Sequence, residues 1–158
     1  MKSRINPRWA AFYVISAVFS LMIAGTALKA ANTRLDDREA VHLNDEERQF
    51  VLVEMQNYVV SLQQLISALS TNDMQGVATA ARPMGMQAMQ NAPATLMAKM
   101  PGGFRSLGMP THMAFDQIAQ SAESGVDASS ILSMLSKAMN NCVACHASYR
   151  IERAAPQK

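Results

Sequence analysis

Apolar residues recur at helical spacing along the chain from residue 44 onward. Between residues 44 and 70 they follow one another at alternating intervals of four and three, at Val51, Met55, Tyr58, Leu62, Leu65 and Leu69. This interval keeps apolar side chains on one face of an α-helix. Asn44 stands three residues before Glu47, as in a capping box. We therefore expect a helix from Asn44 to about Ser70.

A second helix is expected after Asn72, which we predict as its cap. The apolar pattern of this segment ends at Asn91 and Pro93. Pro83 lies inside the pattern and should kink the helix or start a new one, because its ring removes an amide donor and clashes with the preceding turn. Residues 94–109 have no clear pattern, and PGG at 101–103 is expected to break helical structure.

Two more helices are expected in the remaining chain. Thr111 is predicted to cap the third, and Gly125 to close it. Asp127 is predicted to cap the last, whose apolar positions again alternate at four and three. They are Ile131, Leu135, Ala138, Cys142, Cys145 and Tyr149.

No segment reads convincingly as a β-strand, so the expected fold class is all-α. The economical architecture is an antiparallel four-helix bundle with its longest connection in the centre. We assign the bundle to residues 44–153 and a polar linker to residues 32–43.

The first 31 residues form a targeting segment. Residues 2–8 are basic, and residues 9–28 are twenty consecutive uncharged and mainly apolar positions. A basic start followed by such a run directs export across a bacterial inner membrane. The run is long for a cleaved signal peptide and suits an anchor helix, so both a signal peptide and a signal anchor are considered for residues 1–31. The domain that follows is expected in the periplasm.

The positive net charge of the chain comes from its N-terminal segment. The chain of 158 residues has a formal charge of +2, with 14 basic and 12 acidic residues. Four of the basic residues and none of the acidic ones lie within residues 1–31, which leaves the exported part with a charge of −2. We therefore expect no nucleic-acid partner. Aromatic residues make up only 6% while methionine is frequent, with 13 residues, so the core should depend on aliphatic and Met side chains.

The candidate chemistry is concentrated in CVACH at residues 142–146. It contains both cysteines of the chain, Cys142 and Cys145, followed directly by His146. This is the pattern of c-type haem attachment. The two thiols reach the two vinyl groups on one edge of haem, and the histidine presents an imidazole to the iron.

Two other kinds of site fit these residues less well. Structural zinc needs four ligands, and neither His42 nor His112 has a suitable spacing to complete the set. A thiol–disulfide site usually lies at a helix start next to a βαβ unit, whereas this motif lies near the end of a helix.

The segment CVACHASYR at the C-terminal end of a helical chain resembles the class II c-type cytochromes, the cytochrome c-prime family. The resemblance covers about residues 43–153 and includes ERQ at residues 47–49. It implies a four-helix bundle around one covalent haem c, with Cys142 and Cys145 as thioether attachments and His146 as the proximal iron ligand. It also admits a homodimer.

The resemblance implies that the residue over the opposite iron face comes from the first helix. Counting from Arg48 reaches Leu52, whereas counting back from the helix end reaches Met55. We prefer Met55, which lies on the inner seam, as the candidate sixth ligand; the alternative for Met55 is a flexible core filler. His112 and His42 are weaker candidates.

Two arginines are candidate cofactor neighbours. Arg150 is expected one turn beyond His146, where its charge could tune the iron or meet a partner; a solvated helix-end charge is the alternative. Arg48 is a candidate partner of a haem propionate, or it bridges to the acids beside it.

Three functions follow from these expectations, and none is enzymatic turnover. The first is one-electron transfer between redox protein partners of the periplasm or inner membrane. The second is small-gas binding at a pentacoordinate haem. The third is a haem subunit of a larger oxidoreductase, anchored through residues 9–28. The methionines of residues 84–113 could suit Cu(I), although core and loop packing explains them better.

Overall fold

The computed structural model describes residues 36–155. The predicted signal or anchor segment, residues 1–31, lies outside them. The chain divides into two compact units, Met1–Asp37 and Arg38–Lys158, and every element below belongs to the second. Among residues 36–155, no helix is both long and apolar enough to cross a membrane.

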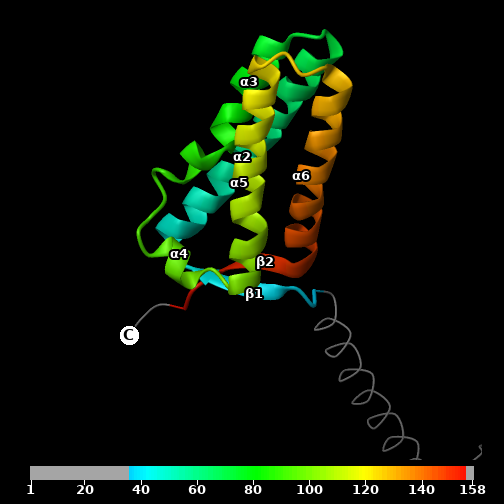
Figure 1. The fold of residues 1–158 in the computed structure, drawn as a ribbon. Helices are drawn as coiled ribbons and strands as arrows, with labels where there is room; N and C mark the ends of the chain where they lie inside the picture. The colour runs from blue at the N-terminus through cyan, green and yellow to red at the C-terminus, as the bar shows by residue number, and fades with distance from the viewer. Residues whose placement is uncertain (1–35, 156–158) are drawn as a thin grey trace, which may run out of the picture. The chain divides into compact units, whose positions relative to one another are not determined.

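The described part is mostly helical, at 73% helix, so the all-α expectation holds at that level. The elements follow one another along the chain in this order: β1 (Glu39–Leu43), α2 (Asp45–Ser70), α3 (Met74–Ala81), the 3₁₀ helices η1 (Arg82–Met84) and η2 (Met86–Met89), α4 (Leu96–Lys99), α5 (Gly102–Glu123), α6 (Ala128–Ser148) and β2 (Tyr149–Arg153). Figure 1 shows α2, α3, α5 and α6 as the main helices, with the two strands across one end.

The first helix begins and ends as predicted. The Asn44 side chain accepts a hydrogen bond from the Glu47 amide at 2.8 Å, and Glu47 Oε2 accepts one from the Asn44 amide at 3.0 Å. This reciprocal pair is a capping box, and it satisfies two amides that the first turn would leave without partners. The predicted helix of residues 44–70 is confirmed.

The start of the second helix was predicted one residue too early. Asp73, not Asn72, caps α3, with its Oδ1 accepting a hydrogen bond from the Gly76 amide at 2.8 Å. Asn72 has a φ of 57°, a left-handed conformation that asparagine tolerates, and so it makes the turn instead. The predicted break at Pro83 is confirmed, because α3 ends at Ala81 and Pro83 lies in the 3₁₀ helix η1.

The third helix is longer than predicted. Pro101 precedes its first turn, and Gly102 and Gly103 lie inside α5, so PGG is a helix start and not a break. Pro110 is inside the helix as well. Thr111 does not cap it; its hydroxyl donates to the Leu107 carbonyl at 2.7 Å. Proline costs the helix one amide donor, and the surrounding packing holds the helix through that position.

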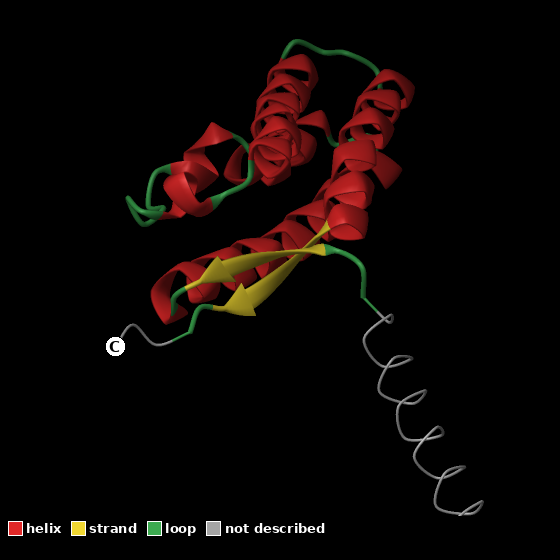
Figure 2. Ribbon diagram, turned by 90° about the horizontal axis from the view of Figure 1, so that it is seen from below, coloured by secondary structure: helices red, strands yellow, loops and turns green. Residues whose placement is uncertain are grey.

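The expectation of no strand was wrong. β1 and β2 form a two-stranded parallel ladder in which Glu39 pairs with Tyr149 and Leu43 with Arg153. Residues 39–43, expected as the end of a polar linker, therefore form a strand, and α6 ends at Ser148 where the chain enters the ladder. Figure 2 shows the two strands lying across the end of the helices.

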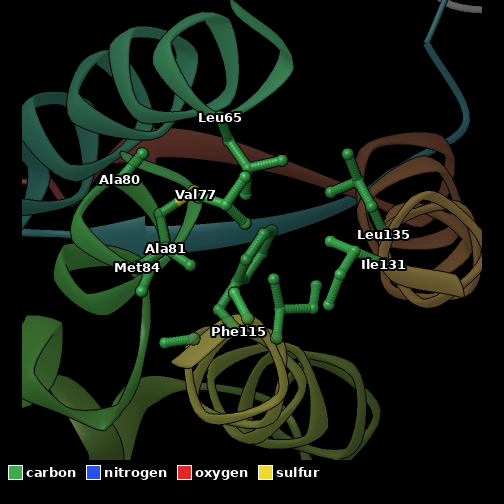
Figure 3. Close-up of a cluster of buried hydrophobic side chains, with 12 residues drawn as sticks. Leu65, Val77, Ala80, Ala81, Met84, Phe115, Ile131 and Leu135 are labelled. Atoms are coloured by element: carbon green, nitrogen blue, oxygen red, sulfur yellow. The ribbon is translucent and has the colours of Figure 1, made fainter. Parts of the chain in front are cut away.

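Two clusters of buried side chains hold these elements together. The central core joins α2, α3, α5 and α6, and Figure 3 shows its side chains converging between the four helices. Its largest members are Leu65, Val77, Met84, Phe115, Ile118, Ile131 and Leu135. The end core lies beneath the ladder and consists of Val41, Leu43, Val51, Leu96 and Met100. In β1, the buried residues Val41 and Leu43 are separated by the exposed His42. The strand has only five residues, so this alternation is too short to be recognised in the sequence.

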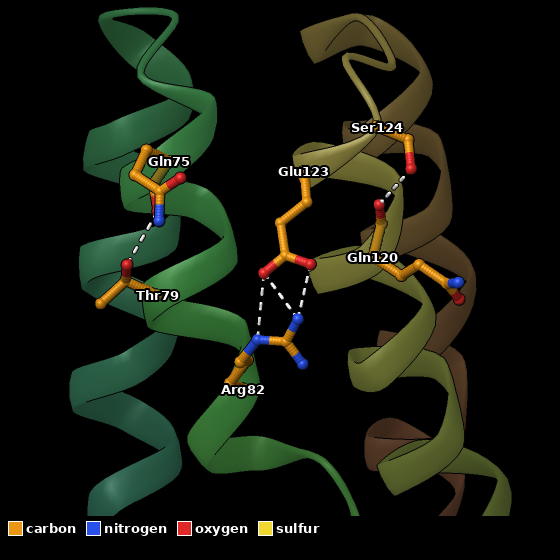
Figure 4. A network of polar contacts seen from close by, with 6 residues as sticks. All are labelled: Gln75, Thr79, Arg82, Gln120, Glu123 and Ser124. Carbon is orange, nitrogen blue, oxygen red and sulfur yellow. Dashed lines mark hydrogen bonds and ion pairs between the residues drawn. The ribbon is translucent and has the colours of Figure 1, made fainter.

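The helices pack in chain order around the central core. α2 packs against α3, α3 against α5, and α5 against α6, while α2 and α6 share no comparable interface. Arg82 of η1 and Glu123 of α5 form a bidentate ion pair with Nη2–Oε2 and Nη2–Oε1 distances of 2.5 and 2.6 Å (Figure 4). Both side chains are exposed, so this pair adds little to stability.

Glu47 is the one buried carboxylate among the described residues, and it ties α2 to α4. Its Oε2 accepts a hydrogen bond from Lys99 Nζ at 2.6 Å, and Thr95 donates to its other oxygen. Burial by itself raises the pKa of Glu47, but the hydrogen bonds from Lys99, Thr95 and the Asn44 amide and the charge of Lys99 outweigh it and lower the pKa to about 2.

We expect Glu47→Gln to destabilise the protein by about 2 kcal/mol at pH 7, because hydrogen bonds to a charged group are lost. The native pKa lies below the ordinary value of 4.5, so the contribution of the carboxylate is present above pH 4.5 and is lost as the pH falls toward 2. Denaturant unfolding at several pH values measures both effects. The difference between wild type and Glu47→Gln should shrink over this window; a constant difference would contradict the assigned pKa.

Candidate functional site

The two cysteines lie one turn apart near the C-terminal end of α6. Both are half-buried free thiols. Cys142 follows the buried residues Ile131, Leu135 and Ala138 along the inner face of the helix. Burial raises the pKa of both thiols, and the neighbouring Cys142 adds to the effect at Cys145. Thiols held neutral in this way do not suit a thiol–disulfide site, which requires a lowered pKa.

His146 follows on the next position of the same turn, and its imidazole is exposed. Its backbone carbonyl accepts a hydrogen bond from Arg38 Nη1 at 3.2 Å. Over residues 36–155, no group of three or more His, Cys, Asp or Glu side chains is arranged to hold a metal ion. A structural zinc site needs such a group, so these residues do not support the zinc interpretation. Haem attachment requires only two thiols and one nearby imidazole nitrogen from the protein.

The side of α6 that carries His146 can be placed from its neighbours. Met134, Lys137 and Asn141 line a hollow together with residues of α5, so this flank faces α5. With 3.6 residues per turn, His146 lies on the opposite flank. Three large apolar side chains share that flank and are exposed, namely Leu132, Met139 and Val143, at 56%, 40% and 68%.

A matching apolar flank runs along α2. Gly76 of α3 lies against Ala68, which places α3 on that side of α2. On the other side lie Val59 and Ile66, exposed at 68% and 53%, together with the half-buried Met55 and Leu62. Because the helices surround one core in the order α2, α3, α5, α6, these two flanks lie on the side where α2 and α6 are neighbours. We call the two flanks together the α2–α6 seam.

The ladder separates the start of α2 from the end of α6 that carries CVACH. β2 begins at the last turn of α6, and Arg153 at its far end pairs with Asp45 in the first turn of α2, with Nε and Oδ1 2.8 Å apart. Five residues of strand span about 13 Å, whereas packed helices lie about 8–10 Å apart. The start of α2 and the end of α6 are therefore too far apart to pack directly.

The residues of the seam fit a haem group. Two free, half-buried thiols at the required spacing lie on the adjoining inner face of α6, one exposed imidazole follows them, and exposed apolar side chains lie on both flanks.

The other predicted site residues are placed differently. Arg48 is half-buried on the seam flank of α2, two turns before Met55, and within residues 36–155 its guanidinium forms no ion pair with the acids beside it. Met55 is half-buried and packs against the end core. Leu52 is half-buried nearby.

Arg150 does not lie one helical turn beyond His146, because α6 has already ended. It lies in β2, where its Nε donates to the Arg38 carbonyl at 3.1 Å and its guanidinium pairs with Glu152. The expected position of Arg150 is therefore corrected from the helix to the ladder.

His112 is also in a different place from that expected. It lies in the middle of α5, and its Nδ1 is 2.8 Å from the Tyr58 hydroxyl and 3.1 Å from the Met84 carbonyl. Its Nδ1 is thus engaged inside the protein. Burial is the main cause that raises the pKa of Tyr58, and the charge of Glu54 adds to it.

Sequence reasoning missed Arg38, which contacts the end of α6, and it placed Tyr149 in the last helix. Tyr149 instead begins β2, and its ring stacks edge-on against Phe104 of α5 with ring centroids 5.3 Å apart. A side chain at Gly103 would collide with the Tyr149 hydroxyl. The sequence shows only that Arg38 stands directly before a short segment with alternating apolar residues. It does not show that Arg38 contacts His146, which is 108 residues away.

Compared with family models, curated proteins and solved structures, the chain gave no match.

Proposed function

We propose that this protein is a periplasmic c-type cytochrome of class II, an antiparallel four-helix bundle that carries one electron through a covalently attached haem. The observation that carries the proposal is the placement of CVACH: both thiols are free and half-buried, one turn apart near the end of α6, and the exposed His146 beside them shares a flank with exposed apolar side chains. Export by residues 1–31 supports it, because c-type cytochromes are assembled outside the cytoplasm.

The residues of the chain have distinct parts in this proposal. Cys142 and Cys145 attach the haem, and His146 is the proximal ligand. Arg48 has a guanidinium without an ion-pair partner among the described residues and lies on the seam flank, so it is the candidate partner of a propionate. The haem supplies an iron that changes oxidation state by one electron. The apolar lining of the seam excludes water from it, which keeps structural change on electron transfer small.

The proposal is tested by producing the full chain together with a c-type cytochrome maturation system. The expected product has a mass increased by one haem that survives denaturation, and its absorption spectra change reversibly between the oxidised and reduced forms. Voltammetry should show one reversible one-electron wave. A chain that remains haem-free under conditions where a control cytochrome is loaded would contradict the proposal.

One observation favours a second function, small-gas binding. Met55 packs against the end core, so it is partly committed to packing. If it stays there, the iron keeps an open sixth position, and the protein binds small gases. A third proposal, a membrane-tethered haem subunit, rests on the uncharged run of residues 9–28 and is judged by co-purification with an inner-membrane oxidoreductase.

Substitution of Met55 separates electron carrier from gas binder. With a thioether ligand, the oxidised wild type is low-spin, and Met55→Ala should become high-spin and bind carbon monoxide rapidly when reduced. Met74→Ala, a half-buried methionine at the far end of α3, is the matched control and should change neither property. Absorption and electron paramagnetic resonance spectra record the spin state. An unchanged spectrum in Met55→Ala would exclude this residue as the sixth ligand.

A further inference from the structure

We propose that Arg38, directly before β1, is a positioning residue for His146 and forms part of the haem site. This inference rests on the proposed function. It starts from a contact between residues 108 positions apart: Arg38 Nη1 donates to the His146 carbonyl at 3.2 Å and to the Tyr149 carbonyl at 3.4 Å.

The contact meets a structural need at the end of α6. The last carbonyls of a helix have no partners within the helix, and they carry the negative end of its dipole. At the C-terminus of α6, the Tyr149 amide donates to the Cys145 carbonyl. The Arg38 guanidinium supplies donors and a positive charge to the turn that carries His146.

The contact is reciprocal, and this fixes its geometry. Arg150 Nε donates to the Arg38 carbonyl at 3.1 Å, while the Arg38 side chain reaches back to the residues before Arg150. The ladder begins directly beside this exchange, where Glu39 pairs with Tyr149. Its far end is fixed by the Ala154 amide, which donates to the Leu43 carbonyl at 2.8 Å. The His146 carbonyl is therefore held by a residue directly before β1, and that residue is fixed in turn by Arg150 and the ladder.

This arrangement gives Arg38 two effects on a bound iron. It limits rotation and fraying of the last turn of α6, which fixes the direction of the imidazole. It also places a positive charge close to the ligand, which favours the reduced form because that form has one positive charge fewer.

The test compares three full-length variants matured with haem. Arg38→Gln removes the charge and keeps amide donors, Arg38→Lys keeps the charge, and Arg153→Gln removes a charge from the exposed far end of the same ladder. At low ionic strength, Arg38→Gln should shift the reduction equilibrium toward the oxidised form by about two- to fivefold, which corresponds to the known range for a cation at a helix C-terminus. Arg38→Lys should restore most of the shift, and Arg153→Gln should change it less than Arg38→Gln does.

A second readout does not use the loaded protein. In the haem-free full chain, amide hydrogen exchange at Tyr149 should be faster in Arg38→Gln than in wild type, because the turn frays. Equal reduction equilibria and equal exchange in wild type and Arg38→Gln would overturn the inference. This outcome differs from a failure of the proposed function, in which the wild type takes up no covalent haem at all.

Discussion

Replacing Cys142 and Cys145 together by serine should abolish covalent haem attachment and leave the helical domain folded. Attachment requires a sulfur at each position, and a hydroxyl does not replace it. Neither thiol belongs to the central core or the end core, and both are half-buried, so serine should cost less than about 1 kcal/mol of stability.

The measurements are mass spectrometry under denaturing conditions and far-ultraviolet circular dichroism of the same samples. The double variant should have the mass of the bare polypeptide and the helical signal of the haem-free wild type. Each single variant retains one thiol and should attach haem through one bond at reduced yield. Ser136→Ala, an exposed position on the same helix, is the matched control and should be loaded fully. Covalent haem in the double variant would refute the assignment of these residues.

The ends of the helices could be predicted where a single residue determines the local backbone structure. Asn44 with Glu47 and Asp127 with its first turn satisfy amides close to them in sequence, so their roles are visible in the sequence itself. Pro83 acts in the same local way. The start of α5 was missed because Pro101, Gly102 and Gly103 usually interrupt helices. Packing of the half-buried Phe104 against Tyr149 keeps this segment helical.

The ladder could not be predicted, because its two strands are separated by more than 100 residues. Each strand has only five residues, and a pair of this size is marginal without further packing. It forms here because Val41 and Leu43 are buried completely in the end core, against residues of α2 and α4. The ladder also explains why Arg150 is not in a helix. Tyr149 begins β2, so α6 ends at Ser148 and Arg150 lies in the strand.

The candidate site was predictable in its chemistry and not in its surroundings. The motif CVACH gives the residue types that attach haem and their order. The helical period places its two thiols on one face of α6. The seam flank of α2 depends on which side α3 covers, and this is a property of the packed helices. Arg38 depends on the ladder and has no local signal of its chemical role.

Phe115→Ala should produce the largest loss of stability, about 4 kcal/mol, and the loss should not depend on the cofactor. Phe115 is among the largest fully buried side chains, at 1% exposure, and it lies between Leu65, Ile131 and Leu135 in the central core (Figure 3). Its ring also contacts Tyr58, with centroids 6.3 Å apart. Alanine removes these contacts and leaves a cavity where three helices meet. Because a domain of this size is stable by about 5–15 kcal/mol, such a loss brings the protein close to unfolding.

Denaturant unfolding of the haem-free chain measures this effect, which should appear as a lower midpoint with an unchanged slope. Phe104→Ala is the matched control, because it removes the same ring from a half-buried position on the same helix and should cost less than about 2 kcal/mol. Haem that binds the folded state raises the midpoints of both variants and leaves their order unchanged. A smaller loss for Phe115→Ala than for Phe104→Ala would mean that the end core, and not the central core, contributes most to the stability of the fold.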